Sequence, residues 1–240
     1  MAHVLSEGNP DRRRDWILSP EPLKPRARDH ALVGVLALQG DFREHRLVLE
    51  RLGADTREVR GTADMRGLDG LIVPGGESTT MTKLMRATGL DQIIREFAAR
   101  GGPVFGTCAG LITLARETVE RDLPTLGLID IVARRNAFGR QVHSFETELS
   151  IPELGSKPLR AVFIRGPRIE ASGPGVHVLA AIDGHGVAAE QGMVLVTAFH
   201  PEITDDTRLH QRFLDMVHRQ RNAGSDQAAA RQHAREEVVS

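Results

Sequence analysis

The stretch PVFGTCAGLITLA, residues 103–115, decides the fold prediction. It reads as a short apolar strand, a tight turn and a helix, with Cys108 at the turn. A strand-to-helix turn lifts the side chain at its centre above the sheet edge, and the usual pattern for such a nucleophile elbow is Gly-x-Ser-x-Gly. Here Gly106 and Gly110 flank a thiol instead of a hydroxyl. The stretch therefore predicts a sheet-and-helix fold with a reactive group at the turn.

Cys108 is the only cysteine among 240 residues, so neither an internal disulfide nor a zinc-finger spacing is available. A thiol at a helix N-terminus beside an imidazolium ionises readily and becomes a nucleophile. The alternative is a structural cysteine, because this side chain packs well inside proteins. The glycines on either side favour the nucleophile.

Apolar runs alternate with amphipathic stretches upstream of the elbow. Repeated strand-then-helix order predicts a parallel sheet. Within the first predicted helix, residues 41–52, the side chains of Phe42, His45, Leu49 and Leu52 share one face, and Gly53 provides a left-handed stop. The predicted segments are 31–38, 41–53, 70–76, 78–89, 90–101, 103–106 and 109–117.

After about residue 127 the strands are closer together, which indicates a more antiparallel half. A final helix is predicted over residues 205–220. The prolines and charges of residues 1–30 favour a disordered extension. Residues 221–240 are polar and alanine-rich and are expected to form a C-terminal tail; a frayed helix is the alternative there, without an apolar face wide enough to dock firmly. The expected folded domain is 31–220.

The charge balance, 31 Lys plus Arg against 32 Asp plus Glu, offers no field that would attract nucleic acid or an anionic membrane. No apolar run reaches the roughly 18 residues of a membrane span, and the charged start lacks the apolar part of a secretion signal. We expect a cytoplasmic protein whose partners are small molecules or other proteins.

The stretch VTAFHPE, residues 196–202, supplies a candidate base. His200 and Glu202 are two residues apart at the end of a predicted strand, so we expect both side chains on one face. The carboxylate would then orient the imidazole, as in a catalytic triad. A surface turn is the alternative, and three other histidines compete for the role: His143, His177 and His185.

The stretch LIVPGGEST, residues 71–79, ends another predicted strand with a glycine pair. Glycines allow backbone conformations that other residues avoid, so N–H groups here can face a developing oxyanion. The alternatives are a phosphate-binding loop or a plain turn. The Gly-Lys-Ser/Thr ending of a Walker motif is absent.

Six stretches together closely resemble the glutaminase subunit of pyridoxal 5'-phosphate synthase, a class I (triad) glutamine amidotransferase. The similarity covers about residues 32–218 and implies a three-layer, flavodoxin-like open mixed sheet flanked by helices. FGTCAGL and FHPE indicate the amidotransferase class, whereas the others point to the vitamin B6 branch. The stretches are GVLALQGDFREH, LIVPGGESTTM, FGTCAGLI, RNAFGRQVHSFE, VFIRGP and FHPE.

The resemblance implies hydrolysis of L-glutamine to glutamate and ammonia through a thioester on Cys108, with His200 moving protons and Glu202 orienting the ring. It implies oxyanion donors at the backbone N–H groups of Gly76 and Ala109. The implied glutamine-binding residues are Gly76, Glu77, Ser78, Arg135, Ile164 and Arg165.

In the family the ammonia passes to a separate (β/α)₈ synthase subunit that condenses a pentose phosphate with a triose phosphate. The resemblance implies assemblies of twelve plus twelve subunits, partner contact near Gln39 and Gly40, and neither a metal nor a cofactor on the glutaminase. The 30 residues before the first strand depart from the family pattern.

Three alternatives stay open on the sequence alone. One is a glutaminase that serves another acceptor, such as a purine or imidazole precursor. Another is a cysteine-based redox sensor or chaperone on a related fold, for which His200 and Glu202 are superfluous. The last is a docking module that organises a synthase without catalysis.

Overall fold

The computed structural model describes residues 30–121, 123–137 and 144–239. The predicted N-terminal extension therefore lies outside the described residues, apart from His30. Within the described chain, no helix combines the length and the apolar character needed to cross a membrane.

Four neighbouring parallel strands form the first half of the main sheet, in the order β2-β1-β3-β4. Most of their residues are buried apolar side chains, as expected when helices cover both faces. The predicted parallel sheet is confirmed, whereas β2 was not predicted because DTREV is polar and only half-buried. The strands are β1 (Leu32–Leu36), β2 (Asp55–Val59), β3 (Gly70–Val73) and β4 (Val104–Thr107).

The second half of the chain completes a mixed sheet. Strand β12 (Val194–Thr197) pairs parallel with β4 and antiparallel with β11 (His185–Gln191). The sheet then continues in the order β11-β9-β6-β5, and β10 pairs with β11. A separate antiparallel pair is formed by β7 (Ser144–Leu149) and β8 (Leu159–Ile164). The other strands are β5 (Ala115–Thr118), β6 (Ile129–Arg134), β9 (Arg168–Ser172) and β10 (His177–Ile182).

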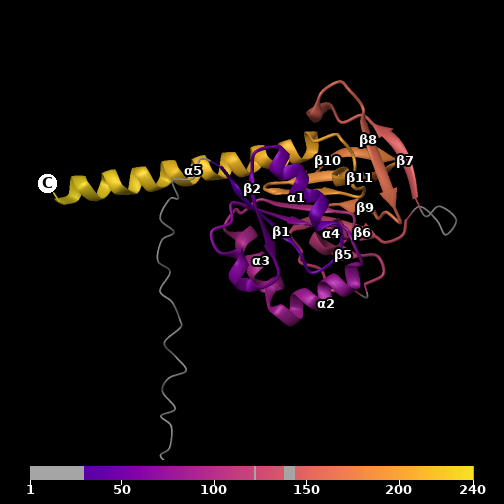
Figure 1. The fold of residues 1–240 in the computed structure, drawn as a ribbon, viewed down its shortest axis with the longest axis horizontal. Coiled ribbons are helices and arrows are strands. Elements are labelled where there is room, and N and C mark those ends of the chain that lie inside the picture. Colours follow the sequence, from indigo (N-terminus) through magenta and orange to yellow (C-terminus); the bar gives the residue numbers. More distant parts are fainter. Residues whose placement is uncertain (1–29, 122, 138–143, 240) are drawn as a thin grey trace, which may run out of the picture.

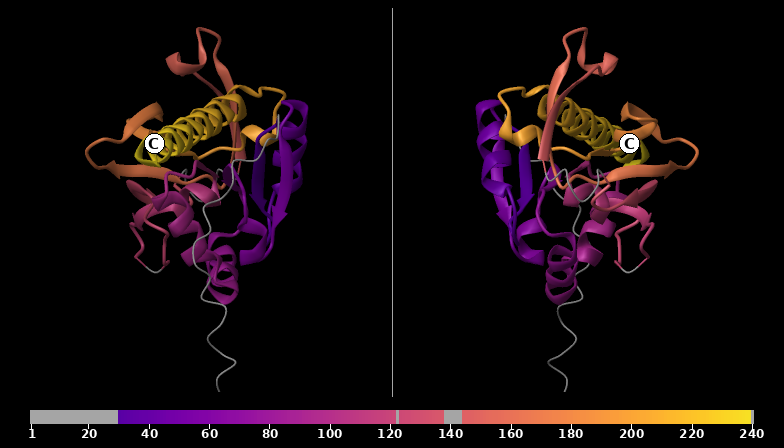
Figure 2. Two further views of the ribbon diagram at one scale, coloured as in Figure 1. Left: turned by 90° about the vertical axis from the view of Figure 1, so that its left-hand side faces the viewer. Right: turned by 90° about the vertical axis from the view of Figure 1, so that its right-hand side faces the viewer.

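Helices cover both faces of this sheet (Figure 1). They are α1 (Phe42–Arg51), α2 (Ser78–Thr88), α3 (Leu90–Ala99), α4 (Ala109–Leu114) and α5 (Arg208–Val239), with 3₁₀ turns η2 (Thr62–Met65), η3 (Pro152–Leu154) and η4 (Pro201–Ile203). Figures 1 and 2 show α5 on one side of the molecule and α2 and α3 on the opposite side.

Two neighbouring residues of β4 show the three layers. The Phe105 ring contacts His45 of α1 and Phe213 of α5. A Cβ on Gly106 would instead meet Leu114 of α4 at 2.7 Å. Because consecutive strand residues face opposite sides of a sheet, α1 and α5 form one layer and α4 belongs to the other. The predicted three-layer open mixed sheet is confirmed.

The helix predicted after the elbow is shorter than expected. Helix α4 ends at Leu114, and residues 115–118 form β5, which pairs parallel with β6. Every residue of α4 is buried, so the stretch carries no amphipathic period that could mark where the helix stops. The strand forms because a distant partner strand is available.

The last helix is longer than predicted. Helix α5 runs from Arg208 to Val239 without a break at Gly224, so it crosses the expected boundary at residue 220. Its buried side chains pack against the sheet, and Figure 1 shows its C-terminal part continuing past the sheet. The buried residues are Leu209, His210, Phe213, Leu214, Met216 and Val217.

Candidate active site

Cys108 occupies a strained turn directly after β4. Its backbone has φ 49° and ψ −105°, a region that non-glycine residues seldom adopt. The Cys108 N–H donates to the Thr197 carbonyl at 2.8 Å, which ties the turn to the end of β12. The thiol Sγ lies 3.9 Å from the Ile164 carbonyl oxygen. The predicted strand-turn-helix geometry is therefore present.

The glycine at position 110 lets α4 approach the neighbouring strand. A Cβ on Gly110 would lie 2.0 Å from the carbonyl oxygen of Val73, the last residue of β3. Such a contact is far inside van der Waals distance, and both groups belong to the backbone. Helix α4 can sit beside the loop after β3 only if position 110 has no side chain.

Replacing Gly110 with alanine is expected to destabilise the protein by roughly 1–3 kcal/mol, because relief of the clash requires α4 or β3 to move. Thermal or urea unfolding measures this loss. Gly61→Ala is the matched control, since Gly61 has φ −151° and the nearest atom lies 4.0 Å from its Cβ position. Equal stability of the two variants would contradict the packing argument.

His200 and Glu202 meet, but not through strand alternation. Strand β12 ends at Thr197, and Glu202 belongs to η4. The expectation that both side chains project from one strand face was therefore wrong. The 3₁₀ turn brings them together instead, with His200 Nδ1 2.7 Å from Glu202 Oε1. Both residues are buried.

The competing histidines lie elsewhere. His177 of β10 is paired with Glu153 at 3.2 Å and is largely exposed. His185 begins β11 and is not among the residues around Cys108. His143 lies outside the described residues. Of the described candidates, His200 is the one that shares a cleft with Cys108.

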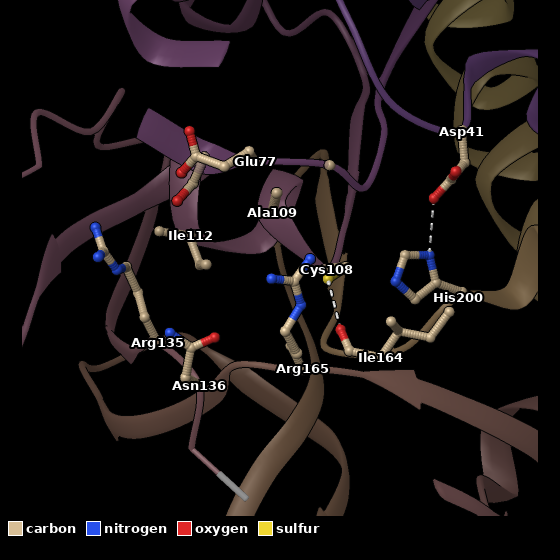
Figure 3. Close-up of a pocket in the computed structure, with 12 residues that line it drawn as sticks. Asp41, Glu77, Cys108, Ala109, Ile112, Arg135, Asn136, Ile164, Arg165 and His200 are labelled. Atoms are coloured by element: carbon tan, nitrogen blue, oxygen red, sulfur yellow. Dashed lines mark hydrogen bonds and ion pairs between the residues drawn. The ribbon is translucent and has the colours of Figure 1, made fainter. Parts of the chain in front are cut away.

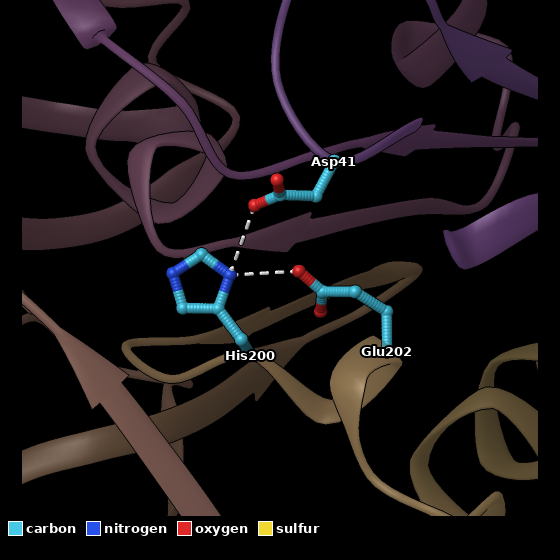
Figure 4. A group of neighbouring side chains, drawn as sticks. All are labelled: Asp41, His200 and Glu202. Carbon is cyan, nitrogen blue, oxygen red and sulfur yellow. Dashed lines mark hydrogen bonds and ion pairs between the residues drawn. The ribbon is translucent and has the colours of Figure 1, made fainter. Parts of the chain in front are cut away.

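Asp41 is a second carboxylate beside His200 and is not among the site residues predicted from the sequence. Its Oδ2 lies 3.3 Å from the same Nδ1 atom that contacts Glu202 (Figure 4). Asp41 precedes α1 and follows the carboxyl end of β1, where open parallel sheets place functional groups. This position after a predicted strand is the sequence feature that could have marked Asp41 as a site residue.

The charges around His200 reinforce its protonated form. Burial works to lower the pKa of His200, but hydrogen bonds with Asp41, the Cys108 thiol and Glu202 outweigh it and raise that pKa to about 12. Burial raises the pKa of Glu202, although His200 opposes this. The hydrogen bond to His200 lowers the pKa of Asp41. The cleft therefore favours an imidazolium at neutral pH.

The donor atoms of Asp41, His200 and Glu202 lie within 4.8 Å of one another, a spacing that also suits a metal ion. The same atoms form ion pairs at 2.7 and 3.3 Å. We interpret the group as an acid–base cluster because Nδ1, the atom nearest to both carboxylates, is already hydrogen-bonded.

Replacing Asp41 with asparagine is expected to lower the pKa of His200, since Glu202 then acts as the single carboxylate at Nδ1. A ¹H NMR titration of the His200 ring measures the change. The pKa of His200 is higher in the folded state, so its ion pair stabilises the folded state fully below pH 6.5 and progressively less as the pH rises. The pKa of Asp41 is lower in the folded state, so its carboxylate stabilises the folded state above about pH 4.

The difference in unfolding free energy between the wild type and the Asp41→Asn variant is therefore expected to be largest between about pH 4 and 6.5. It should shrink toward alkaline pH. A difference that grows above pH 7 would contradict this account of the pair.

The glycine-pair loop after β3 packs against the loop before α1. A Cβ on Gly40 would lie 1.8 Å from the Gly75 carbonyl oxygen, and the Gln39 side chain donates from Nε2 to the Glu77 carbonyl at 2.8 Å. Gly76 has φ 145°, a conformation suited to glycine. The two loops therefore hold each other in place.

Glu77 caps the N-terminus of α2. Its carboxylate accepts from the backbone N–H groups of Thr79 and Thr80 at 2.9 and 2.8 Å. The Thr80 hydroxyl and these N–H groups lower the pKa of Glu77 to about 2 against the opposing effect of burial. Glu77 is therefore ionised throughout the neutral range.

A cleft of about 350 Å³ brings the predicted site residues together (Figure 3). Nine of the ten predicted residues line it, and Glu202 lies buried behind His200. Three further residues were not predicted: Asp41, Ile112 and Asn136. The nine are Gly76, Glu77, Ser78, Cys108, Ala109, Arg135, Ile164, Arg165 and His200.

Strained backbone gathers at this cleft. Among the described residues, five non-glycine residues have positive φ, and three of them, Cys108, Asn136 and Arg165, line the cleft. Such conformations cost roughly 1–3 kcal/mol each and cluster at functional sites. The volume is at the small end of the range for small-molecule sites.

Comparison with known proteins decides the family. Residues 35–219 match the SNO glutamine amidotransferase family. The chain belongs to the SNO glutamine amidotransferase family. This SNO family member is 50% identical over 186 residues to "Pyridoxal 5'-phosphate synthase subunit PdxT" of Fervidobacterium nodosum, covering 78% of this chain and 97% of the relative. It is 54% identical over 190 residues to the protein of that name from Deinococcus radiodurans, covering 77% and 96%.

Solved structures give the same fold for the SNO family member. A structure described as glutamine amidotransferase matches with a TM-score of 0.74 at 50% identity, covering 77% of this chain and 98% of that one. A chain of PurLQS from Thermotoga maritima matches with a TM-score of 0.61 at 16% identity, covering 78% and 99%. The second match shows the fold alone, and together they confirm the predicted class I amidotransferase architecture.

Proposed function

We propose that this chain hydrolyses L-glutamine to glutamate and ammonia as the glutaminase subunit of pyridoxal 5'-phosphate synthase. The ammonia passes to a synthase subunit that makes pyridoxal 5'-phosphate from a pentose phosphate and a triose phosphate. Relatives at about half identity carry the synthase subunit name over nearly their whole length. The observation that carries the proposal is the convergence of Cys108 with the His200–Glu202 pair at one cleft.

The first half of the proposed reaction forms a thioester. The Cys108 thiolate attacks the side-chain amide carbon of glutamine, and the carbonyl oxygen becomes an oxyanion. The His200 imidazolium then gives its proton to the amide nitrogen, so that the C–N bond breaks and ammonia leaves. The raised pKa of His200 supports this order, because the ring is still protonated when the leaving amide nitrogen becomes basic enough to accept the proton.

Water completes the proposed cycle. The neutral His200 ring takes a proton from water, whose oxygen attacks the thioester carbon. Collapse of this intermediate breaks the C–S bond, releases glutamate and restores the thiolate. Glu202 stabilises the imidazolium and fixes the ring through Nδ1, which leaves Nε2 for the reacting groups.

The other cleft residues take binding roles in this proposal. The N–H groups of Ala109, the first residue of α4, and of Gly76 would stabilise the oxyanion. Arginines hold carboxylates through charge-assisted hydrogen bonds, so Arg135 and Arg165 suit the glutamine α-carboxylate. The remaining glutamine-binding residues in the proposal are Gly76, Glu77, Ser78 and Ile164.

The proposal includes the domain limits and the partner. Residues 31–220 would form the amidotransferase domain, in agreement with the extent of the family match. The partner is a (β/α)₈ synthase subunit in a twelve plus twelve assembly, which contacts Gln39 and Gly40. A cytoplasmic location stays a prediction from the sequence.

Reconstitution tests the proposed function. The chain is mixed with the synthase subunit of the same cell, a pentose phosphate, a triose phosphate and glutamine, and pyridoxal 5'-phosphate is followed by absorbance. We expect product formation that depends on glutamine, and a single adduct on Cys108 after treatment with a glutamine-like electrophile. Product formation from ammonia but never from glutamine, with Cys108 unlabelled, would reject the proposal.

A further inference from the structure

A buried polar network lies behind the His200–Glu202 pair and has no role in the mechanism proposed above. His45 of α1 and His210 of α5 are both fully buried. His45 Nδ1 lies 2.9 Å from His210 Nε2. His45 Nε2 lies 3.1 Å from Thr107 Oγ1 and 3.4 Å from Glu202 Oε2. The network therefore joins two helices to the last residue of β4, directly before Cys108, and to the carboxylate that contacts His200.

Both histidines are neutral. Burial lowers the pKa of His45 well below its usual value, with further contributions from His210 and His200. Burial and the nearby Arg51 lower the pKa of His210 to about 3. Each ring therefore carries one proton on one of its two nitrogens. The proton positions decide which groups the network can support.

The unpartnered atoms select one arrangement of these protons. If His45 carried its proton on Nδ1, it would donate to His210 Nε2, and the His210 proton would sit on Nδ1. In the described part of the chain, His210 Nδ1 is buried and has no hydrogen-bond partner. A buried N–H without an acceptor is costly, and the His45 Nε2 lone pair would face the Glu202 carboxylate.

The opposite arrangement satisfies more groups. With its proton on Nε2, His45 donates to Thr107 Oγ1, with Glu202 Oε2 3.4 Å from the same nitrogen, and its Nδ1 accepts a hydrogen bond from the His210 Nε2–H. The His210 Nδ1 atom without a partner is then an unprotonated nitrogen, which costs less to bury than an N–H without an acceptor. Glu202 Oε2 is buried and directed away from His200 (Figure 4). In this arrangement it faces the protonated Nε2 of His45 at 3.4 Å.

We propose that His45 is a positioning residue: its Nε2–H donates to Thr107 Oγ1 and lies 3.4 Å from Glu202 Oε2, where its partial positive charge holds the carboxylate so that Oε1 faces His200. His210 fixes the tautomer of His45 by donating its Nε2–H to His45 Nδ1. Because His45 is not among the residues that line the cleft with Cys108, it acts through Glu202. This inference rests on the proposed function for its kinetic consequences, but the proton arrangement itself is independent of it.

The pH behaviour of this network depends on every charged or titratable group that faces it. Asp41 and His200 face Glu202 from the loop before α1 and from the segment after β12, and Arg51 of α1 acts on His210. Without the His45 donor the Glu202 carboxylate is less stabilised, so it takes up a proton at higher pH. The acid limb of the kcat profile then moves to higher pH.

Two substitutions at His45 separate positioning from packing. In His45→Gln the side-chain amide nitrogen can occupy the position of Nε2, whereas in His45→Asn the shorter amide reaches only the position of Nδ1. With the synthase subunit present, we expect kcat in His45→Asn to fall by roughly tenfold to a hundredfold at little change in KM. We expect His45→Gln to stay within a few-fold of the wild type and to keep its acid limb.

Thermal unfolding is measured alongside, because both variants disturb the same buried site. If activity in the two variants follows stability alone, and neither acid limb moves, the positioning role is wrong. Equal kcat values in the two variants would also overturn it.

Ring ¹⁵N NMR tests the proton arrangement without any assay of function. For the wild type we expect His45 and His210 each to be the neutral Nε2–H tautomer between pH 6 and 8. A Nδ1–H tautomer or an imidazolium at His45 would overturn the inference. If the tautomers are as expected but glutamine is never hydrolysed, the proposed function fails and the network stands.

Discussion

Cys108→Ala is expected to lower glutamine hydrolysis by at least about 10⁴-fold, because loss of the nucleophile in a comparable triad costs about 10⁶ in kcat. No other thiol exists in the chain to replace it. Ammonia release is measured with the synthase subunit present, because the proposed function places the chain in that complex. The variant should still bind the partner.

Cys108 is buried and the change removes only its sulfur, so the folded state should survive. An unfolding midpoint within a few degrees of the wild type provides the control. If ammonia release in the variant stays within tenfold of the wild-type rate, Cys108 is not the nucleophile.

His200→Asn is expected to have an effect nearly as large, about 10⁴-fold. Asparagine cannot move protons at this position, and it leaves the Glu202 carboxylate buried without its charged partner. The second effect destabilises the protein, so the folded fraction is measured by circular dichroism and the rate is corrected for it. Labelling of Cys108 by a glutamine-like electrophile should slow as well.

Asp41→Asn is the matched comparison for His200→Asn. It removes a carboxylate from the same Nδ1 atom but keeps the ring and the Glu202 contact, so we expect a loss below about tenfold. Full function of the folded His200→Asn protein, together with dependence on the oxidation state of Cys108, would instead favour the redox-sensor alternative.

Strands β1, β3 and β4 of the parallel half could be predicted because they are continuous apolar runs. Strands β2 and β11 contain polar or small residues, and each forms where a neighbouring strand supplies hydrogen bonds, so local pattern gave no signal. Strand β5 was hidden inside an apolar stretch that fits helix and strand equally well. These elements depend on partners that are distant in sequence.

The sequence predicts which residues line the candidate site, but not the turns and contacts that bring them together. His200 and Glu202 were paired through an expected strand face, whereas a 3₁₀ turn joins them. His45 was read as part of the packing face of its helix, and its polar contacts follow only from the position of α5. Asp41 belongs to no local pattern that marks it as a site residue. Its contact with His200 forms only because the chain returns to this point at the far end of the sequence.

The position of β12 has a consequence for the chain as it leaves the ribosome. This strand is the last to be synthesised, yet it lies in the middle of the sheet, between β4 and β11. Until residue 202 has emerged, β12 cannot join the two halves of the sheet, and neither His200 nor Glu202 can reach the thiol. The central strand and the acid–base pair therefore arrive together, late in synthesis and just before α5 packs onto the sheet.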